Sequence, residues 1–402
     1  MYKFNQIEKL IQNNISLIKQ TEIIKIKDAK DRYLAESIYS KIDIPPNNNA
    51  AVDGYLFNYK SLISDPLKKY QVVSEVHAGE ENIKVYSSKS VVKISTGAYL
   101  PKNFDTLIME EDFNVKDKII SLKKIAIKKW MNIRKKGEDI KKKQKVFSSG
   151  HFLRPQDIGM LSSLGYKEVK VVRKIKVGIL SNGNELLEPG KKKSTKKIYD
   201  SNRYILNSFL DKKSITVIDY GIVKDDFHKI EEKIKVLKNK CDTILISGGA
   251  SAGSKDYVVK IIKKIGVLKF WKVSIKPGRP FGFGILKGRK PILILPGNPV
   301  ACFVIFFLFG KIVLNYLQSE TIFKLNYFLV KSNFSMKKKL GREEFLRGRL
   351  VIRNGIMYVD KYRKQGAGIL NSLVWSNGLI RLKSNETFIK KNSMLEFYPF
   401  DR

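Results

Sequence analysis

Acidic side chains recur in this sequence at the points where apolar runs end. Glu185 follows the run 175–181, Asp225 follows the run 215–223, and Asp256 follows a cluster of glycines. Glycine-rich turns that lead into a helix expose backbone N–H groups, which bind anions such as phosphate. Carboxylates beside such a turn are the oxygen ligands that Mg²⁺ uses together with phosphate and water. The pattern predicts Mg²⁺–phosphate chemistry. Taken singly, however, Glu185 and Asp225 are explained equally well as solvated acids in loops.

The segment YDSN adds three polar side chains at the start of an expected helix. These are Asp200, Ser201 and Asn202. A helix-capping role explains Asp200 as well as a ligand contact does. Asp226 is better explained as a solvated acid at a helix start.

Two proline-containing turns complete the set of candidate loops. KPGRP supplies the cations Lys276 and Arg279, and PGNP opens a helix with a turn whose prolines fix φ. A Walker GxxxxGK[ST] motif is missing and the glycines lack GxGxxG spacing, which disfavours nucleotide hydrolysis and dinucleotide binding. The three isolated histidines favour surface or packing roles over catalysis.

Alternating apolar strands and helices between 173 and 325 would position these loops. We expect strands at 175–181, 215–223, 242–247 and 291–295, with helices between them. Such alternation predicts a doubly wound, mostly parallel sheet that binds its ligand at the carboxyl ends of the strands.

The flanking regions have a different pattern. Helical spacing predicts short helices near 4–11 and 29–38, whereas short apolar strands broken by glycine, asparagine and proline predict two β-rich regions. The expected fold is therefore a multidomain α/β protein with a central parallel-sheet domain. Its expected parts are an N-terminal helical and linker part (1–45 with 140–172), a small β-rich domain (46–139), the α/β domain (173–325) and a C-terminal β domain (326–402).

Composition restricts the remaining possibilities. The chain has 402 residues, with 77 Lys+Arg against 38 Asp+Glu and a formal charge of +39. The charge fits a nucleic-acid or anionic-membrane surface, but its scattered distribution favours a general composition bias. Two cysteines in apolar runs exclude a disulfide framework and a zinc site of cysteine pairs, and predict buried thiols. No signal-peptide pattern is present and the longest apolar run, 300–310, is shorter than the ~20 residues of a membrane span. We therefore expect a cytoplasmic protein with no membrane partner and no specific nucleic acid.

Nine motifs in register resemble one family, the MoeA family of molybdopterin molybdenumtransferases, which is related to the gephyrin E domain. The motifs are PPNNNAAVDGYLF, STGAYLPKNFDTLIMEED, IRKKGEDI, SNGNELLEPG, YDSN, GIVKDD, SGGASAGSKDY, KPGRPFGFG and LPGNPVACF. The likeness runs from about residue 4 to 400. Any one motif is weakly specific, whereas nine in order are highly specific.

The resemblance implies an activity and its partners. It implies that adenylylated molybdopterin and molybdate react to give molybdenum cofactor and AMP with the help of Mg²⁺. The central domain would be of the molybdopterin-binding type. The resemblance also implies a homodimer with its active site in a cleft between subunits. Molybdopterin adenylyltransferase and the enzymes that mature the cofactor downstream would be its partners.

The resemblance also assigns roles to residues that match the family's motifs. The catalytic acids would be Asp53, Glu185, Asp225 and Asp256, of which the last three would also bind the metal. Residues expected to bind substrate are Thr96, Asp139, Asp200, Ser201, Asn202, Gly248, Gly249, Ser251, Lys276, Pro277, Arg279, Pro296, Gly297, Asn298, Pro299 and Arg347, the last as an oxyanion contact.

Several positions depart from the family pattern. The usual TGDEL is NGNEL, with Asn182 and Asn184, and two serines expected to bind molybdate are replaced by Ala301 and Ala367. The acids remain, which favours an active enzyme. The alternative is a catalytically weakened, MoeA-like scaffold or binding protein, and a nucleic-acid-binding role rests on charge alone.

Overall fold

The computed structural model describes residues 1–64, 69–80, 85–123, 125–192, 194–249, 257–319 and 324–400. The chain divides into two compact units. The first comprises Met1–Ala35, Gly150–Ile158 and Glu168–Arg402, and the second comprises Glu36–Ser149 and Gly159–Lys167. The boundaries of the four parts expected from the sequence stay predictions.

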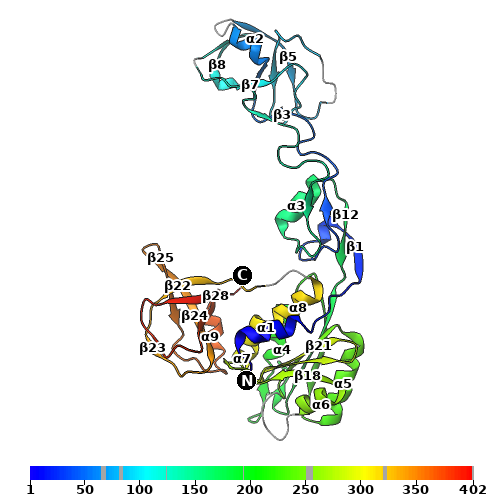
Figure 1. Cartoon of the computed structure of the whole chain (residues 1–402), viewed down its shortest axis with the longest axis vertical. Coiled ribbons are helices and arrows are strands. Elements are labelled where there is room, and N and C mark those ends of the chain that lie inside the picture. The colour runs from blue at the N-terminus through cyan, green and yellow to red at the C-terminus, as the bar shows by residue number, and fades with distance from the viewer. Residues whose placement is uncertain are drawn as a thin grey trace. The chain divides into compact units, whose positions relative to one another are not determined.

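A six-stranded mixed sheet forms the centre of the first unit (Figure 1). Its strand order is β16–β13–β17–β21–β20–β18, in which the first four strands are parallel and β20 pairs antiparallel with both β21 and β18. The bounds are β13 Ile175–Asn182, β16 Ile215–Val223, β17 Thr243–Ser247, β18 Gly266–Trp271, β20 Gly282–Leu286 and β21 Lys290–Leu295. The predicted doubly wound, mostly parallel sheet is confirmed.

Helices cover both faces of this sheet. In β13, Val177 and Ile179 belong to the hydrophobic core that also contains side chains of α1, α4, α7 and α8, whereas Leu180 belongs to a second core with side chains of α5 and α6 on the opposite face. Side chains of a strand alternate between faces, so a strand buried on both sides is apolar throughout. Each fully buried aliphatic side chain contributes about 1.5–3 kcal/mol. The helices are α1 Phe4–Gln12, α4 Asn202–Leu210, α5 Phe227–Lys240, α6 Tyr257–Ile265, α7 Pro299–Ile305 and α8 Lys311–Gln318.

A π-helical turn, Phe306–Gly310, joins α7 to α8 in one continuous helix. This helix, Pro299–Gln318, is longer than the apolar run noted in the sequence, and its length and composition would allow it to cross a membrane. However, 89% of its most apolar window is buried within the protein, as in a core helix. Burial raises the pKa of the Cys302 thiol in this helix to about 12 and that of Cys241 to about 11, so the expected buried thiols are confirmed.

Five strands near the C-terminus close into a ring. The pairing order is β24–β25–β22–β28–β26, and β26 pairs back with β24. The bounds are β19 Ile275–Lys276, which pairs with β24, then β22 Phe328–Ser332, β24 Glu343–Arg353, β25 Ile356–Lys361, β26 Gly378–Leu382 and β28 Met394–Pro399. A short pair, β23 Met336–Lys337 with β27 Phe388–Ile389, and helix α9 Asn371–Trp375 complete this part. The predicted C-terminal β domain is confirmed.

The second unit contains the predicted small β-rich part. Its six-stranded sheet has the order β7–β4–β6–β5–β9–β8. The bounds are β4 Gly54–Phe57, β5 Tyr70–Val76, β6 Val91–Ile94, β7 Thr106–Met109, β8 Phe113–Lys116 and β9 Ile119–Leu122. Shorter elements are β2 Ile38–Tyr39, β3 Asn49–Ala50, α2 Tyr59–Ser64, a 3₁₀ turn Glu110–Asp112, β10 Ile133–Arg134 and β11 Lys145–Phe147.

The expected helix at 29–38 is wrong. The chain instead forms a 3₁₀ turn at Ile26–Asp28 and isolated bridges at Tyr33 and Leu34. The guanidinium of Arg32 donates to the carbonyl of Val172 at 2.8 Å. This long-range contact with the pair β1 (Thr21–Lys25) and β12 (Glu168–Val172) outweighs the weak local preference for a helix. Helix α3 spans Pro155–Ser163.

Gly178 allows α5 to lie close against β13, and its replacement tests this packing. A Cβ at Gly178 would lie 2.9 Å from the Cys241 Sγ and 2.9 Å from the Leu237 Cδ2. We expect Gly178→Val to lower the free energy of unfolding by about 1–3 kcal/mol, measured by urea denaturation. The control is Gly159→Ala in α3, where a Cβ meets nothing within 4 Å and stability should hold or rise. Equal stability of Gly178→Val and wild type would contradict this packing.

Candidate functional site

The loops after the parallel strands are joined at the carboxyl edge of the sheet. Asn202, at the start of α4, donates through its Nδ2 to the Ser247 Oγ at 2.6 Å and to the Gly297 carbonyl at 2.7 Å. Ser247 ends β17, and Gly297 lies in the PGNP turn after β21. One amide therefore connects three loops that the sequence had placed at the site.

Glycine at position 248 lets the turn after β17 lie against the end of β13. Gly248 has a φ of +93°, and a Cβ there would lie 2.1 Å from the carbonyl oxygen of Asn182. Its N–H donates to the Leu295 carbonyl at 3.2 Å, and Gly249 also has a positive φ of +62°. The predicted phosphate-binding turn begins here. Ser251 and Asp256, which we expected further along this turn, lie outside the described residues.

Asp225 is held by the loop after β13. Its Oδ1 accepts from the Asn182 Nδ2 at 2.9 Å, and its Oδ2 accepts from the Asn184 N–H at 3.1 Å. The Asn184 Oδ1 in turn accepts from the N–H of Asp225 at 3.2 Å. Both asparagines depart from the family pattern, yet they fix the orientation of this acid. Asp226 instead caps α5 by accepting from the Lys229 N–H at 2.8 Å, as its predicted helix-start role requires.

Glu185 lies exposed in the same loop as Asn184. Its carboxylate bends back over Gly183, where an added Cβ would lie 2.7 Å from either carboxylate oxygen. Among the described residues, no group of three or more His, Cys, Asp or Glu side chains could by itself hold a metal ion. Proteins commonly bind Mg²⁺ through one or two carboxylates, with substrate phosphates and water as the other ligands. Glu185 and Asp225, together with the predicted phosphate-binding turn, fit a site of that kind.

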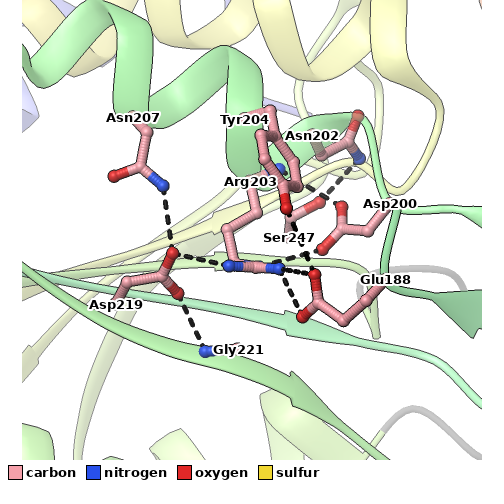
Figure 2. Close-up of polar contacts among 9 residues, drawn as sticks. All are labelled: Glu188, Asp200, Asn202, Arg203, Tyr204, Asn207, Asp219, Gly221 and Ser247. Carbon is pink, nitrogen blue, oxygen red and sulfur yellow. Dashed lines mark hydrogen bonds and ion pairs between the residues drawn. The ribbon is translucent and has the colours of Figure 1, made fainter. Parts of the chain in front are cut away.

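A buried arginine connects the acids of three segments (Figure 2). The guanidinium of Arg203 contacts Asp219 through Nη1 at 2.5 Å, Glu188 through Nη2 at 2.5 Å and Asp200 through Nε at 3.2 Å. Burial alone would lower the pKa of Arg203, but the ion pairs outweigh burial and raise it above its ordinary value. Asp200 also accepts from the Arg203 N–H and is 2% exposed, so its carboxylate supports the start of α4. Ser201 is the N-cap residue of α4, and its hydroxyl makes no capping hydrogen bond.

The KPGRP and PGNP turns meet at α7. Gly278 approaches the helix so closely that a Cβ would lie 2.4 Å from the Cδ1 of Ile305. The Lys276 Nζ pairs with the Glu344 Oε2 at 3.2 Å, and Arg279 is exposed. The predicted turn residues Pro277 and Pro296 are buried, Pro299 is half-buried at the first position of α7, and its N-cap residue Asn298 is exposed.

Arg347 lies in β24 near the same helix but is fully buried. Its guanidinium donates to the Ser372 Oγ at 3.0 Å and to the carbonyls of Phe345 and Gly366 at 3.2 and 3.3 Å. None of the carboxylates in the described ranges pairs with it, and burial lowers its pKa to about 10. Ala367, the residue after Gly366, accepts from the Val300 N–H of α7 at 3.1 Å. An oxyanion contact for Arg347 stays a prediction, and it requires the side chain to become accessible.

The remaining predicted residues lie in the second unit. The Asp53 Oδ1 accepts from the Thr96 N–H at 2.6 Å and from the Thr96 Oγ1 at 2.8 Å. These hydrogen bonds lower the pKa of Asp53 below its usual value. Asp139 is exposed, and its N–H donates to the Ile44 carbonyl at 3.1 Å.

Three buried polar atoms at the sheet edge have no hydrogen-bond partner within the described part of the chain. They are the Ser181 Oγ, the Asn182 Oδ1 and the Asn202 Oδ1. An unsatisfied buried polar atom costs about 1–3 kcal/mol, so these atoms suit a bound water or ligand. Sequence reasoning missed Ser181 and Asn182 as contacts because they sit at the end of an apolar strand.

Sequence reasoning also missed the network around Arg203. One signal was available, because Asp219 is the only acid in the apolar strand ITVIDYGIV. A carboxylate in a buried strand requires a cationic or hydrogen-bonding partner. Arg203 comes directly after the YDSN motif, and Glu188 lies in the same loop as Glu185.

Three family descriptions match consecutive parts of the chain. They are the MoeA N-terminal region (domain I and II) over 2–165, a probable molybdopterin binding domain over 178–316 and the MoeA C-terminal region (domain IV) over 330–400. The chain is 33% identical to the molybdopterin molybdenumtransferase of Haemophilus influenzae, covering 100% of this chain and 99% of the relative. It is 28% identical to the protein of that name from Nostoc, covering 96% and 89%. The crystal structure of the molybdopterin biosynthesis moeA protein from Pyrococcus horikoshii superposes with a TM-score of 0.83 at 31% identity, covering all of both chains.

The contact between Asp53 and Thr96 can be tested by titration. Thr96→Val removes the hydroxyl donor and leaves the backbone N–H. We therefore expect the pKa of Asp53 to rise toward its usual value without reaching it, as measured by ¹³C NMR of the carboxylate. Lys93 also lowers the pKa of Asp53, but it is the weaker cause. The control is Lys93→Gln, in which the pKa of Asp53 should rise less than in Thr96→Val. An unchanged pKa in Thr96→Val would contradict this contact.

Proposed function

The chain belongs to the MoeA family, and from that membership and the geometry above we propose that it is a molybdopterin molybdenumtransferase. The reaction would insert molybdenum from molybdate into the dithiolene of adenylylated molybdopterin and release AMP in a Mg²⁺-dependent step. The substrates would be polyanionic, which suits a site made of backbone N–H groups, cations and a few acids.

One observation carries the proposal: a single sheet edge joins a glycine turn, a helix start and an oriented acid. The amide of Asn202 connects the ends of two strands, and Gly248 touches the backbone of the strand that leads to Glu185. Asp225 is held in place by the same loop. Phosphate binding needs backbone N–H donors that are held close together, and the loops at this edge of the sheet are held together in that way.

The residues of the chain divide into two groups in this proposal. The backbone N–H of Gly249 would bind phosphate. The side-chain oxygens of Asn182 and Asn202, which have no partner among the described residues, would accept hydrogen bonds from polar groups of the ligand. Glu185 and Asp225 would hold Mg²⁺, which would supply positive charge against the phosphates. The second group, Lys276, Arg279 and Arg347, would attract molybdate near the start of α7.

A specific observation favours the alternative of a weakened, scaffold-like member of the family. Arg347 is fully buried, and the neighbouring positions 301 and 367 carry no hydroxyl. Molybdate would therefore find fewer donors than the family pattern provides. A scaffold would form a stable dimer and bind partners without turnover.

The deciding experiment incubates the purified protein with adenylylated molybdopterin, Mg²⁺ and molybdate and measures AMP. We expect AMP release that depends on molybdate, and at least about a tenfold loss in Asp225→Ala, equivalent to ~1.4 kcal/mol of barrier. The matched control is Asp226→Asn, which keeps an N-cap side chain beside Asp225 and should leave turnover unchanged. A folded wild-type protein without molybdate-dependent AMP release would favour the scaffold.

We also propose a homodimer, as the family resemblance implies. Asp53 and Asp225 lie in different compact units of the chain, and subunits would share them across the dimer. Light scattering should give twice the monomer mass of 46.1 kDa. Mixing and refolding Asp53→Ala with Asp225→Ala chains should restore activity in part of the heterodimers. A fully active monomer would overturn the proposal.

A further inference from the structure

We propose that Arg203 is a positioning residue that fixes the loops of the ligand site, a role that rests on the proposed function. Its side chain is 8% exposed, and it binds carboxylates from three separate segments (Figure 2). Asp200 is the only one of these three acids that the sequence placed among the substrate-binding residues, and its buried carboxylate supports the start of α4 instead. Arg203 would therefore act through the loops and not by contact with the reacting atoms.

Each acid that Arg203 binds lies a short distance along the chain from a residue of the site. Glu188 is three residues after Glu185, and Asp200 is two residues before Asn202. The short parallel pair β14 (Leu186–Leu187) and β15 (Ile198–Tyr199) joins these two segments. Fixing Glu188 and Asp200 on one guanidinium thus fixes the distance between a candidate metal ligand and the amide that links the strand ends.

The contact with Asp219 connects Arg203 to β16 as well. The Asp219 Oδ2 accepts from Arg203 at 2.5 Å, and its Oδ1 accepts from the Gly221 N–H at 2.8 Å. Gly221 has a φ of +76° and lies in a bulge, because the pairing with β13 moves from Asp219 to Ile222 while the partner moves only from Ile179 to Ser181. A bulge of this kind shifts the rest of the strand and re-aims the loop at its end. Asp225, two residues beyond the strand, depends on that shift.

Only an arginine can make these three contacts together. Its planar guanidinium uses Nε, Nη1 and Nη2 in three directions, whereas a lysine offers one nitrogen at one point. Glu188 and Asp219 are about a third exposed (32% and 31%), so water can solvate these two carboxylates when the fork is lost. We therefore expect loss of the fork to loosen the loops before it unfolds the domain.

The matched comparison is Arg203→Lys against Arg173→Lys. Arg173 makes a bidentate pair with Asp242 at 2.7 and 2.8 Å, at the amino end of β17 and so at the opposite edge of the same sheet. Both variants keep the charge and lose a planar fork, but only one of them touches the site loops. Any loss of stability that results simply from replacing an arginine with lysine should be equal in the two variants.

The first measurement is hydrogen exchange of the full-length protein. In Arg203→Lys we expect amides in 183–190 and 219–226 to exchange about tenfold faster, with those of β21 unchanged. The second measurement is steady-state kinetics, where KM for adenylylated molybdopterin should rise about tenfold while kcat changes far less. Arg173→Lys should show neither effect.

Three results would overturn the proposal: unchanged loop exchange in Arg203→Lys, an unchanged KM with faster loop exchange, or equal effects in Arg173→Lys. If Arg203→Lys does not fold, Glu188→Gln replaces it, and faster exchange confined to 183–190 supports the proposal whereas unchanged exchange overturns it. Hydrogen exchange does not require turnover. An inactive wild-type protein would therefore refute the proposed function, while the loop exchange would still decide the role of Arg203.

Discussion

The close approach of Gly248 to the backbone of Asn182 is the constraint on which the site depends. A side chain at 248 would overlap the carbonyl oxygen of Asn182 at 2.1 Å, so the turn after β17 can lie against the end of β13 only because this residue is a glycine. Beside this contact, the amide of Asn202 binds Ser247 and Gly297 together. The parallel sheet brings the strand ends to one edge, but this contact turns that edge into a single surface.

The acids around this surface are divided between two tasks. Asp200, Glu188 and Asp219 all bind one guanidinium, that of Arg203, and shape the loops. Glu185 and Asp225 have no cationic partner within the described residues and keep their charge available for a ligand. Sequence spacing alone cannot separate the two tasks, because both kinds of acid come after strands or open helices.

Much of the fold could be predicted from the sequence, and the reasons are specific. The buried strand 175–181 and its parallel partners were evident because they are apolar on both faces, as β13 confirms by packing Ile179 and Leu180 on opposite sides. The region 29–38 was mispredicted because its helical spacing is a weak local signal, whereas Arg32 binds a strand 140 residues away. Arg203 was missed for a related reason, since its three partners are close only after the loops have folded. The residues expected in the second unit stay predictions in their functional roles.

The side-chain amide oxygens of Asn182 and Asn202, which have no partner in the part of the chain that the structure describes, have a consequence for recognition. In both amides the nitrogen is already committed to protein acceptors, so neither side chain can rotate to present a donor without breaking those bonds. The oxygens can only accept, and a ligand atom placed against them must carry a hydrogen. An amino group or a ring N–H of a heterocycle satisfies that requirement, whereas a bare carbonyl or phosphate oxygen is repelled. These acceptors would therefore bind the end of a long substrate that carries N–H groups and not the end that carries phosphate. They would determine the direction in which the substrate lies across the sheet.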